Sequence, residues 1–131
     1  SEYLKYLVKI KNLQHAVFFH GWVDNPTQIL FESDIFLFAS EYEGFGNVIL
    51  EAMSAGLPIV AFNSKGGVTD ILNNGEYGLA IQDCSTKSFS DAVLKLCKDK
   101  DLYKYYSEAS LLRIKYYSMD KISSKLLSEI N

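Results

Sequence analysis

Two glutamates lie on either side of a glycine turn and could bind a polar ligand. Glu43 precedes the turn and Glu51 follows it, within the stretch EYEGFGNVILEAMSAGLPIVAF at residues 41–62. Glycines in the turn allow a ligand to approach the backbone closely. A helix that begins near Asn47 leaves about four backbone N–H groups unpaired at its start. Those groups and the helix dipole favour an anion, typically a phosphate.

The two carboxylates would repel a phosphate, so they are better suited to accept hydrogen bonds from neutral hydroxyl groups. Glu51 lies about one turn into the expected helix, and its side chain leans back toward the helix N-terminus. There it can accept from two vicinal hydroxyls, as on a ribose, while Glu43 can hold hydroxyls on the other side of the phosphate. The arrangement predicts a nucleotide sugar, although for either glutamate alone a solvated surface charge is the simpler interpretation.

Composition limits the class of protein. The chain has 131 residues, which suits one domain, and its 48% apolar and 22% charged residues are typical of a soluble globular protein. A net charge of −3 argues against a nucleic-acid partner. No apolar run reaches the ~20 residues of a membrane span. Cys84 and Cys97 fit no zinc-binding pattern, which predicts reduced thiols in a cytosolic protein.

Strands and helices are expected to alternate through the first two thirds of the chain, and residues from Ser85 onward are expected to be helical. Strands that alternate with helices indicate a Rossmann-like α/β fold, with a parallel sheet of about four strands and helices on both faces. Loops after His20, Phe38 and Phe62 should then meet at one sheet edge, where such folds bind ligands. Asp101 and Ser118 are expected to cap later helices. The expected strands are residues 16–20, 34–38, 58–62 and 79–81.

The stretch SEYEGFGNVILEAMSAGLPIVAFNSKGG resembles the donor-binding motif of retaining glycosyltransferases of the GT-B fold, family 4 type, or glycosyl transferases group 1. In that motif two glutamates are separated by seven residues, with EGFG at the start and EAM-A-GLPVV at the end. Glu43 and Glu51 match it. The resemblance covers residues 13–83 well and implies an N-terminally truncated C-terminal domain. That partial domain would comprise βα units over residues 1–84 and C-terminal helices over residues 85–131.

The resemblance also implies roles for individual residues. Glu51 would bind the donor ribose, and Glu43 would contact the transferred sugar as the catalytic residue. The loop Gly21–Trp22–Val23 would lie near the nucleobase. The family generally needs no bound metal, and we expect no cofactor besides the donor, such as a UDP- or GDP-sugar. The other residues expected to bind the donor are Gly44, Phe45, Gly46, Asn47 and Val48.

The function implied is the donor-binding portion of a transferase that passes a sugar to a saccharide or lipid-linked acceptor. The acceptor would be held by a missing N-terminal domain, so this chain alone is expected to be inactive. The resemblance places the full protein in the cytoplasm, with peripheral association at the inner face of the membrane, in polysaccharide biosynthesis. Two alternatives stay open: a non-catalytic nucleotide-sugar-binding remnant, or a GT-B epimerase- or phosphorylase-like domain.

The sequence departs from the family pattern in three respects. It lacks the segment that supplies an Arg and a Lys to the diphosphate, and Lys65 is the only cation in an expected strand-end loop. Asp70 stands where the family has a glutamate. Two central strands of the family sheet have no counterpart. We therefore expect residues 16–20 to pair directly with residues 34–38, unless another chain fills the gap. The Asp-x-Asp spacing at residues 99–101 is interpreted as a solvated turn.

Overall fold

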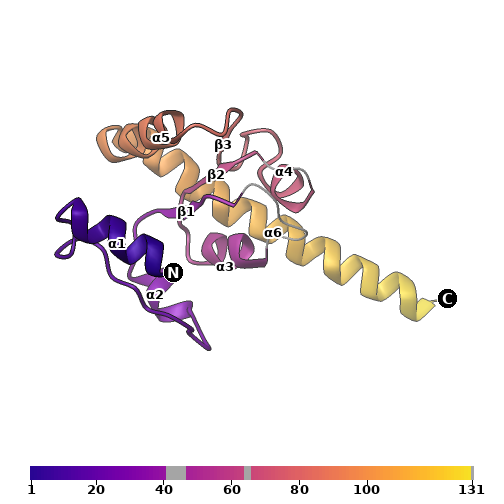
Figure 1. Cartoon of the computed structure of the whole chain (residues 1–131). Helices are drawn as coiled ribbons and strands as arrows, with labels where there is room; N and C mark the ends of the chain where they lie inside the picture. Colours follow the sequence, from indigo (N-terminus) through magenta and orange to yellow (C-terminus); the bar gives the residue numbers. More distant parts are fainter. Residues whose placement is uncertain (41–46, 64–65, 131) are drawn as a thin grey trace.

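A parallel sheet lies at the centre of the computed structural model (Figure 1). The structure describes residues 1–40, 47–63 and 66–130, with side chains as far as residue 118. Within these residues the sheet has three strands, in the order β1-β2-β3. In its register Leu37 lies opposite Val60, and Val60 lies opposite Leu79. The strands are β1 (Phe36–Phe38), β2 (Ile59–Phe62) and β3 (Leu79–Ile81).

Helices connect and cover the strands, and several begin or end at the residues that the sequence indicates. The Asn25 side chain accepts from the N–H of Thr27 at the start of α2, and the Ser85 hydroxyl accepts from the N–H of Ser88 in α5. Gly56 ends α3 with φ +75°, a conformation that favours glycine. The helices are α1 (Glu2–Ile10), α2 (Thr27–Phe31), α3 (Asn47–Ser54), α4 (Gly67–Leu72), α5 (Thr86–Lys98) and α6 (Lys100–Ile130).

The sheet separates two apolar core groups, which alternate along β2 as the pleat requires. Ile59 and Ala61 pack against α2, α3 and α4, whereas Val60 packs against α5 and the first turns of α6. All three side chains are fully buried. The fold class predicted from the sequence is therefore confirmed: a parallel α/β sheet with helices on both faces.

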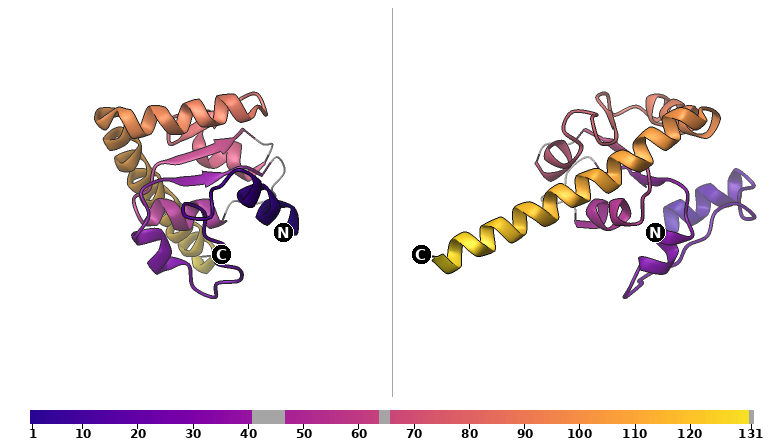
Figure 2. Two further views of the ribbon diagram at one scale, coloured as in Figure 1. Left: turned by 60° about the vertical axis from the view of Figure 1, so that its left-hand side comes forward. Right: turned by 180° about the vertical axis from the view of Figure 1, so that it is seen from behind.

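Helix α6 is fixed to this body by hydroxyl groups. The buried Ser110 donates to the carbonyl oxygen of Leu57 at 2.7 Å, and Ser107 donates to that of Gly56 at 2.7 Å. Tyr106 donates to the carbonyl oxygen of Gly75 at 3.1 Å. The later turns of α6 extend well beyond the sheet (Figure 2). The helix therefore combines an anchored first half with a second half that projects from the body.

The strand expected at residues 16–20 is absent, and its direct pairing with β1 is wrong. Of the strands described, β1 pairs only with β2. Residues 16–20 follow α1 without strand pairing, and Phe18 is 72% exposed. A continuously apolar strand of this kind is stable only when both faces are covered. Here Val17 and Phe19 share a groove with α1 on one side, and Phe18 stays exposed. No strand therefore ends at His20, so the expectation of three converging strand-end loops fails at that position.

Two of the expected helix caps also differ from the structure. The helix predicted to begin at Asp101 begins at Lys100, and the Asp99 carboxylate accepts from the N–H of Leu102. Ser118 caps nothing, because α6 continues through it to Ile130. The sequence around Ser118 contains neither Gly nor Pro, so nothing in the backbone stops the helix there.

Candidate donor-binding site

Parallel strands β1 and β2 end at the same edge of the sheet, which brings the segments after Phe38 and Phe62 together. Helix α3 begins near this edge at Asn47, and both Asn47 and Val48 are exposed. The first N–H groups of a helix have no partner within it, so the start of α3 can donate hydrogen bonds to an anion. The expected positions of Asn47 and Val48 at the mouth of a helix are confirmed.

Glu51 lies one turn into α3, beside a cleft between α2 and α3. The cleft has a volume of about 240 Å³. Glu51 is exposed, and the part of the chain that the structure describes offers it no hydrogen bond or ion pair. The carboxylate is therefore available to accept from ligand hydroxyls. The residues that line the cleft are Thr27, Leu30, Phe31, Glu51, Ser54 and Ala55.

The loop Gly21–Trp22–Val23 lies three residues before α2, which forms the other wall of this cleft. Gly21 has φ +67°, and Trp22 is 90% exposed. The indole Nε1 of Trp22 donates to the Asp24 carboxylate at 2.7 Å, which orients the ring on the surface. An exposed, oriented aromatic ring is suited to stack on a planar ligand group. The loop therefore precedes the helix that lines the cleft beside Glu51, and its contact with a base stays a prediction.

Several predicted site residues lie outside the described residues. They belong to residues 41–46 and 64–65. Their roles stay predictions, as do the donor contacts expected of the described site residues. The predicted residues concerned are Glu43, Gly44, Phe45, Gly46 and Lys65.

The segment after β2 is joined to its surroundings by side-chain amides. Thr69 of α4 donates to the Asn63 side-chain oxygen at 3.2 Å, and the Asn63 amide donates to Gln82 at 3.1 Å. Asp70 is exposed in the first turn of α4, where its negative charge interacts favourably with the helix dipole. These bonds hold the start of α4 beside the end of β2.

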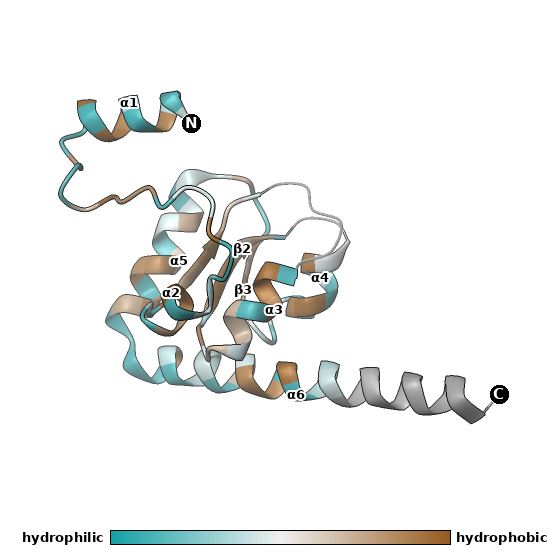
Figure 3. Ribbon diagram, turned by 90° about the horizontal axis from the view of Figure 1, so that it is seen from below, coloured by the Kyte–Doolittle hydropathy of each residue, from teal (hydrophilic) through white to brown (hydrophobic). Residues whose placement is uncertain are grey.

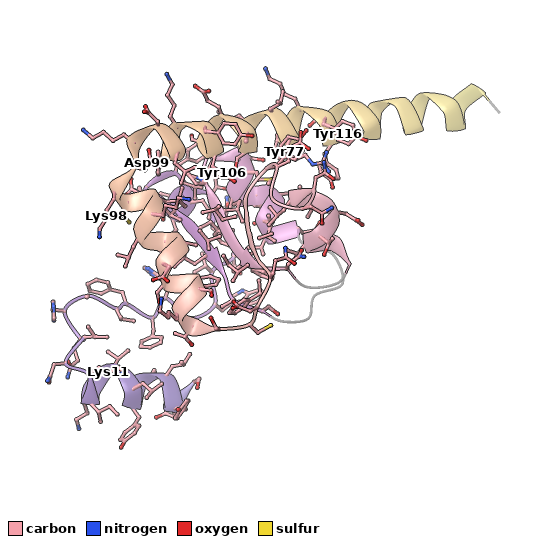
Figure 4. All side chains as sticks on the ribbon, turned by 90° about the horizontal axis from the view of Figure 1, so that it is seen from above. Lys11, Tyr77, Lys98, Asp99, Tyr106 and Tyr116 are labelled. Carbon is pink, nitrogen blue, oxygen red and sulfur yellow. The ribbon has the colours of Figure 1, made fainter. Side chains whose placement is uncertain are left out.

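Arg113 is a structural residue near this region that the sequence interpretation missed. Its guanidinium donates from Nε to the carbonyl oxygen of Ile71 at 2.9 Å and from Nη2 to that of Asp70 at 2.7 Å. Three tyrosine rings lie within 5.0 Å of the guanidinium carbon, and two of them are labelled beside α6 in Figure 4. A tyrosine-rich helix with one arginine was the available signal. The rings belong to Tyr77, Tyr116 and Tyr117.

Other candidate functional residues have ordinary structural settings. Of the Asp-x-Asp residues interpreted as a turn, Asp99 lies between α5 and α6, whereas Lys100 and Asp101 already belong to α6. Cys84 and Cys97 are exposed free thiols. Among the described side chains, no three His, Cys, Asp or Glu residues are grouped to hold a metal ion. In the same part of the chain, no helix combines the length and the apolar character needed to cross a membrane.

Comparison with known proteins identifies the family. The family model for glycosyl transferases group 1 matches residues 1–113. An N-acetylgalactosaminyltransferase of Campylobacter jejuni, named for a diphospho-undecaprenol saccharide, is 28% identical over 92% of this chain and 33% of its own length. An N-acetyl-alpha-D-glucosaminyl L-malate synthase of Bacillus anthracis is 34% identical over 78% of this chain and 26% of its own length.

A solved structure extends the comparison to the whole chain. Staphylococcus aureus TarM, as a point mutant in complex with Fondaparinux, alpha-GlcNAc-glycerol and UDP, matches with a TM-score of 0.84 and 28% identity. The match covers 100% of this chain and 27% of TarM. The chain therefore spans about a quarter to a third of these relatives. On these grounds the chain belongs to the glycosyl transferases group 1 family, as a partial Rossmann-like α/β domain of the GT-B fold.

Proposed function

We propose that this chain is the donor-binding portion of a retaining glycosyltransferase that uses a nucleotide-diphospho-sugar. The observation that carries the proposal is the placement of Glu51. Its exposed carboxylate lies beside a cleft of about 240 Å³, one turn from the first N–H groups of α3, which have no partner within the helix. Acceptors for hydroxyls and donors for an anion thus lie next to each other, which suits a ribose joined to a phosphate.

The proposed chemistry assigns a separate task to each part of the site. Glu51 accepts hydrogen bonds from the two ribose hydroxyls and orients the nucleotide. As the bond between the sugar and the diphosphate breaks, negative charge grows on the departing diphosphate oxygen. The N–H groups of Asn47 and Val48 stabilise that charge because they are already oriented before the reaction. Glu43 contacts the transferred sugar, and an acceptor hydroxyl forms the new glycosidic bond while its proton passes to the departing diphosphate oxygen.

Two known relatives support the substrate class. TarM was solved with UDP, which supports a uridine nucleotide as the first donor to test. The name of the Campylobacter jejuni relative includes a saccharide on diphospho-undecaprenol, which supports a saccharide or lipid-linked acceptor. Such an acceptor would also account for peripheral membrane association of a longer protein. The acceptor site is proposed to lie outside this chain.

Nucleotide titration of the isotope-labelled chain tests the proposal. We expect UDP, GDP or one of their sugars to shift the backbone amide signals of Asn47, Val48 and Glu51. Glu51→Gln should weaken that binding by about tenfold, because two hydrogen bonds to a charged acceptor become weaker. Glu108→Gln, an exposed glutamate on α6, is the matched control and should bind like the parent chain.

Failure of the proposal would be visible in the same experiment. If no nucleotide shifts these amides at millimolar concentration, the chain does not carry a working donor site. Equal loss of nucleotide affinity in Glu51→Gln and Glu108→Gln would show that the loss comes from the change in net charge and not from a contact of Glu51 with the ligand. The second candidate is a non-catalytic nucleotide-sugar-binding remnant. Donor binding without sugar transfer, in a protein that joins this chain to an acceptor-binding domain, would favour that candidate.

A further inference from the structure

A pocket separate from the candidate donor site lies between α6 and residues 73–78, the turn that joins α4 to β3. It has a volume of about 220 Å³ and has no described lining residue in common with the cleft beside Glu51. Figure 3 shows α6 along one side of the body, with its most apolar turns near the middle of the helix. We call this cavity the tyrosine pocket, and its lining residues are Glu76, Tyr77, Tyr105, Glu108, Ala109 and Leu112.

Hydrogen bonds and a ring contact hold the two walls of the tyrosine pocket in place. The hydroxyl of Tyr106 donates to the carbonyl oxygen of Gly75 at 3.1 Å, which joins α6 to the turn. The side-chain amide of Asn73 donates to the Glu76 carboxylate, which fixes that carboxylate on the turn. Tyr105 contacts Tyr106 edge to face, with ring centroids 5.0 Å apart, so the Tyr105 ring is oriented as well. The pocket is therefore formed before any ligand binds.

The tyrosine pocket carries two negative charges that the described residues do not neutralise. Glu76 and Glu108 are both exposed, and neither forms an ion pair within the part of the chain that the structure describes. Lys104 lies one turn before Glu108 on α6, yet the described ion pairs do not include it. Two carboxylates beside one cavity favour a positively charged occupant, because both attract it.

The aromatic lining narrows the choice of cation. The face of a tyrosine ring attracts a cation that lies within about 6 Å of the ring centre. The guanidinium of arginine is planar and weakly hydrated, so it can stack on a ring and still donate to a carboxylate. Arg113 already shows this combination, because it lies 4.6 Å from the centre of the Tyr77 ring while it donates to carbonyl oxygens of α4. Tyr77 also lines the pocket, and Tyr105 adds a second ring, which is 55% exposed.

The remaining lining suits the rest of an arginine side chain from another polypeptide. Leu112, 61% exposed, lies two turns after Tyr105 on the same face of α6 and can cover the methylene groups of such a side chain. Tyrosine and arginine are also among the residue types most enriched at the energetically important contacts of protein interfaces. A second copy of this chain cannot supply the guanidinium, because Arg113 is its only arginine and is already held by α4.

We propose that the tyrosine pocket is a docking site for an arginine side chain of a partner polypeptide. The guanidinium lies against the Tyr105 ring and donates to the carboxylates of Glu76 and Glu108. The methylene groups of the arginine pack on Leu112. This inference rests on the shape and charge of the pocket, and it holds whether or not the chain binds a donor.

Titration of the isotope-labelled chain with short blocked peptides tests the docking site. The probe is acetyl-Gly-Arg-Gly-amide, and the same peptide with lysine or glutamine in place of arginine serves as the comparison. We expect the arginine peptide to shift the backbone amide signals of Glu76, Tyr77 and Glu108 at millimolar concentration. The lysine peptide should bind about threefold more weakly, because an ammonium group stacks less well on a ring, and the glutamine peptide should cause no shift.

Two variants remove the two kinds of contact separately. Glu76→Gln removes a charge but keeps the side-chain oxygen that accepts from Asn73, so the turn is preserved. Tyr105→Leu removes the ring but keeps an apolar side chain. Each should weaken binding of the arginine peptide by at least about threefold. Asp101→Asn, an exposed acid on the same helix but outside the pocket lining, is the matched control and should bind like the parent chain.

Three results would overturn the proposal. If the arginine peptide binds no better than a comparison peptide, the pocket does not recognise a guanidinium. Equal losses of affinity in Glu76→Gln and Asp101→Asn would mean that only the net charge of the chain matters. Absence of shifts at the pocket amides at millimolar concentration would show that no arginine side chain docks there. Unchanged signals of the β2 amides show that a variant is folded, so its loss of binding cannot be assigned to unfolding.

Discussion

The body around the sheet and the N-terminal segment have similar apolar sequences, yet only one of them is buried. In β2, Ile59, Val60 and Ala61 are fully inaccessible to solvent. In residues 16–20, which read as an equally good buried strand, Phe18 is 72% exposed. This contrast shows that an apolar run predicts only the capacity to form a central strand. Whether the strand forms depends on neighbours that supply hydrogen bonds and cover both faces.

The largest expected effect of a point substitution is in the body. Ile59→Ala should lower the free energy of unfolding by about 3 kcal/mol, because it leaves a cavity among fully packed side chains. Phe18→Ala, the counterpart in the N-terminal segment, should change it by less than about 0.5 kcal/mol. Urea denaturation of both variants measures the contrast. Similar losses would mean that the two regions are packed alike in solution.

A smaller effect should follow from removing the anchor between α6 and α4. Arg113→Ala removes two hydrogen bonds to carbonyl oxygens of Asp70 and Ile71 and contacts with three aromatic rings. We expect a loss of about 2 kcal/mol in the free energy of unfolding. Lys115→Ala, an exposed residue on the same helix, is the control for lost charge. If both variants lose the same stability, these contacts do not fix α6 to the body.

The hydroxyl of Tyr106 offers a test of burial that depends on pH. Burial, and to a lesser degree the neighbouring Tyr105, raises the pKa of Tyr106 above its ordinary value of 10.0. Its folded-state pKa thus exceeds that of the unfolded chain, so its contribution is complete below about pH 10 and is lost as pH rises through the folded-state value. Tyr106→Phe should cost about 1 kcal/mol at neutral pH, since the hydrogen bond to Gly75 is lost.

The pH dependence separates that variant from the parent chain. Above about pH 10 the stability of the parent should fall more steeply than that of Tyr106→Phe, until the two curves approach each other. Thermal unfolding from about pH 8 to about pH 11 measures this difference. Parallel curves throughout would show that the Tyr106 hydroxyl titrates as if it were exposed.

The smallest effect is expected from deleting residues 1–12. These residues include the whole of α1, which has no buried residue. We expect the remaining chain to keep its free energy of unfolding within about 1 kcal/mol of the parent. A larger loss would mean that α1 packs on the body in solution, and it would remove the contrast between the two regions.

Much of the fold could be predicted because its signals are local. Pro58 and Gly56 mark the change from α3 to β2, and the capping side chain of Ser85 marks the start of α5. The limits of α6 could not be predicted this way, because serine and aspartate are acceptable both as caps and inside a helix. The strand prediction for residues 16–20 was wrong for a different reason, because strand pairing depends on the whole sheet and not on the local sequence.

The candidate site also combines features that follow from local sequence with features that depend on tertiary packing. The placement of Asn47 and Glu51 on one helix follows from their spacing, because helical periodicity is a property of the chain itself. The cleft could not be foreseen in this way. Thr27 and Phe31 reach Glu51 only because α2 packs on α3. This wall of the cleft consists of residues far apart in sequence, so no local sequence pattern predicts it.

The amino-acid sequence alone indicates the α/β class, the helix starts at Asn47 and after Ser85, and the family, because propensity, capping and the spacing of Glu43 and Glu51 act over a few residues. The tertiary structure alone decided which apolar segments are buried. It also decided that Arg113 fastens α6 to α4 and that β1 keeps a free edge among the described strands. Burial and strand pairing depend on which surfaces pack together. An apolar segment that packs against no other described element stays exposed to solvent.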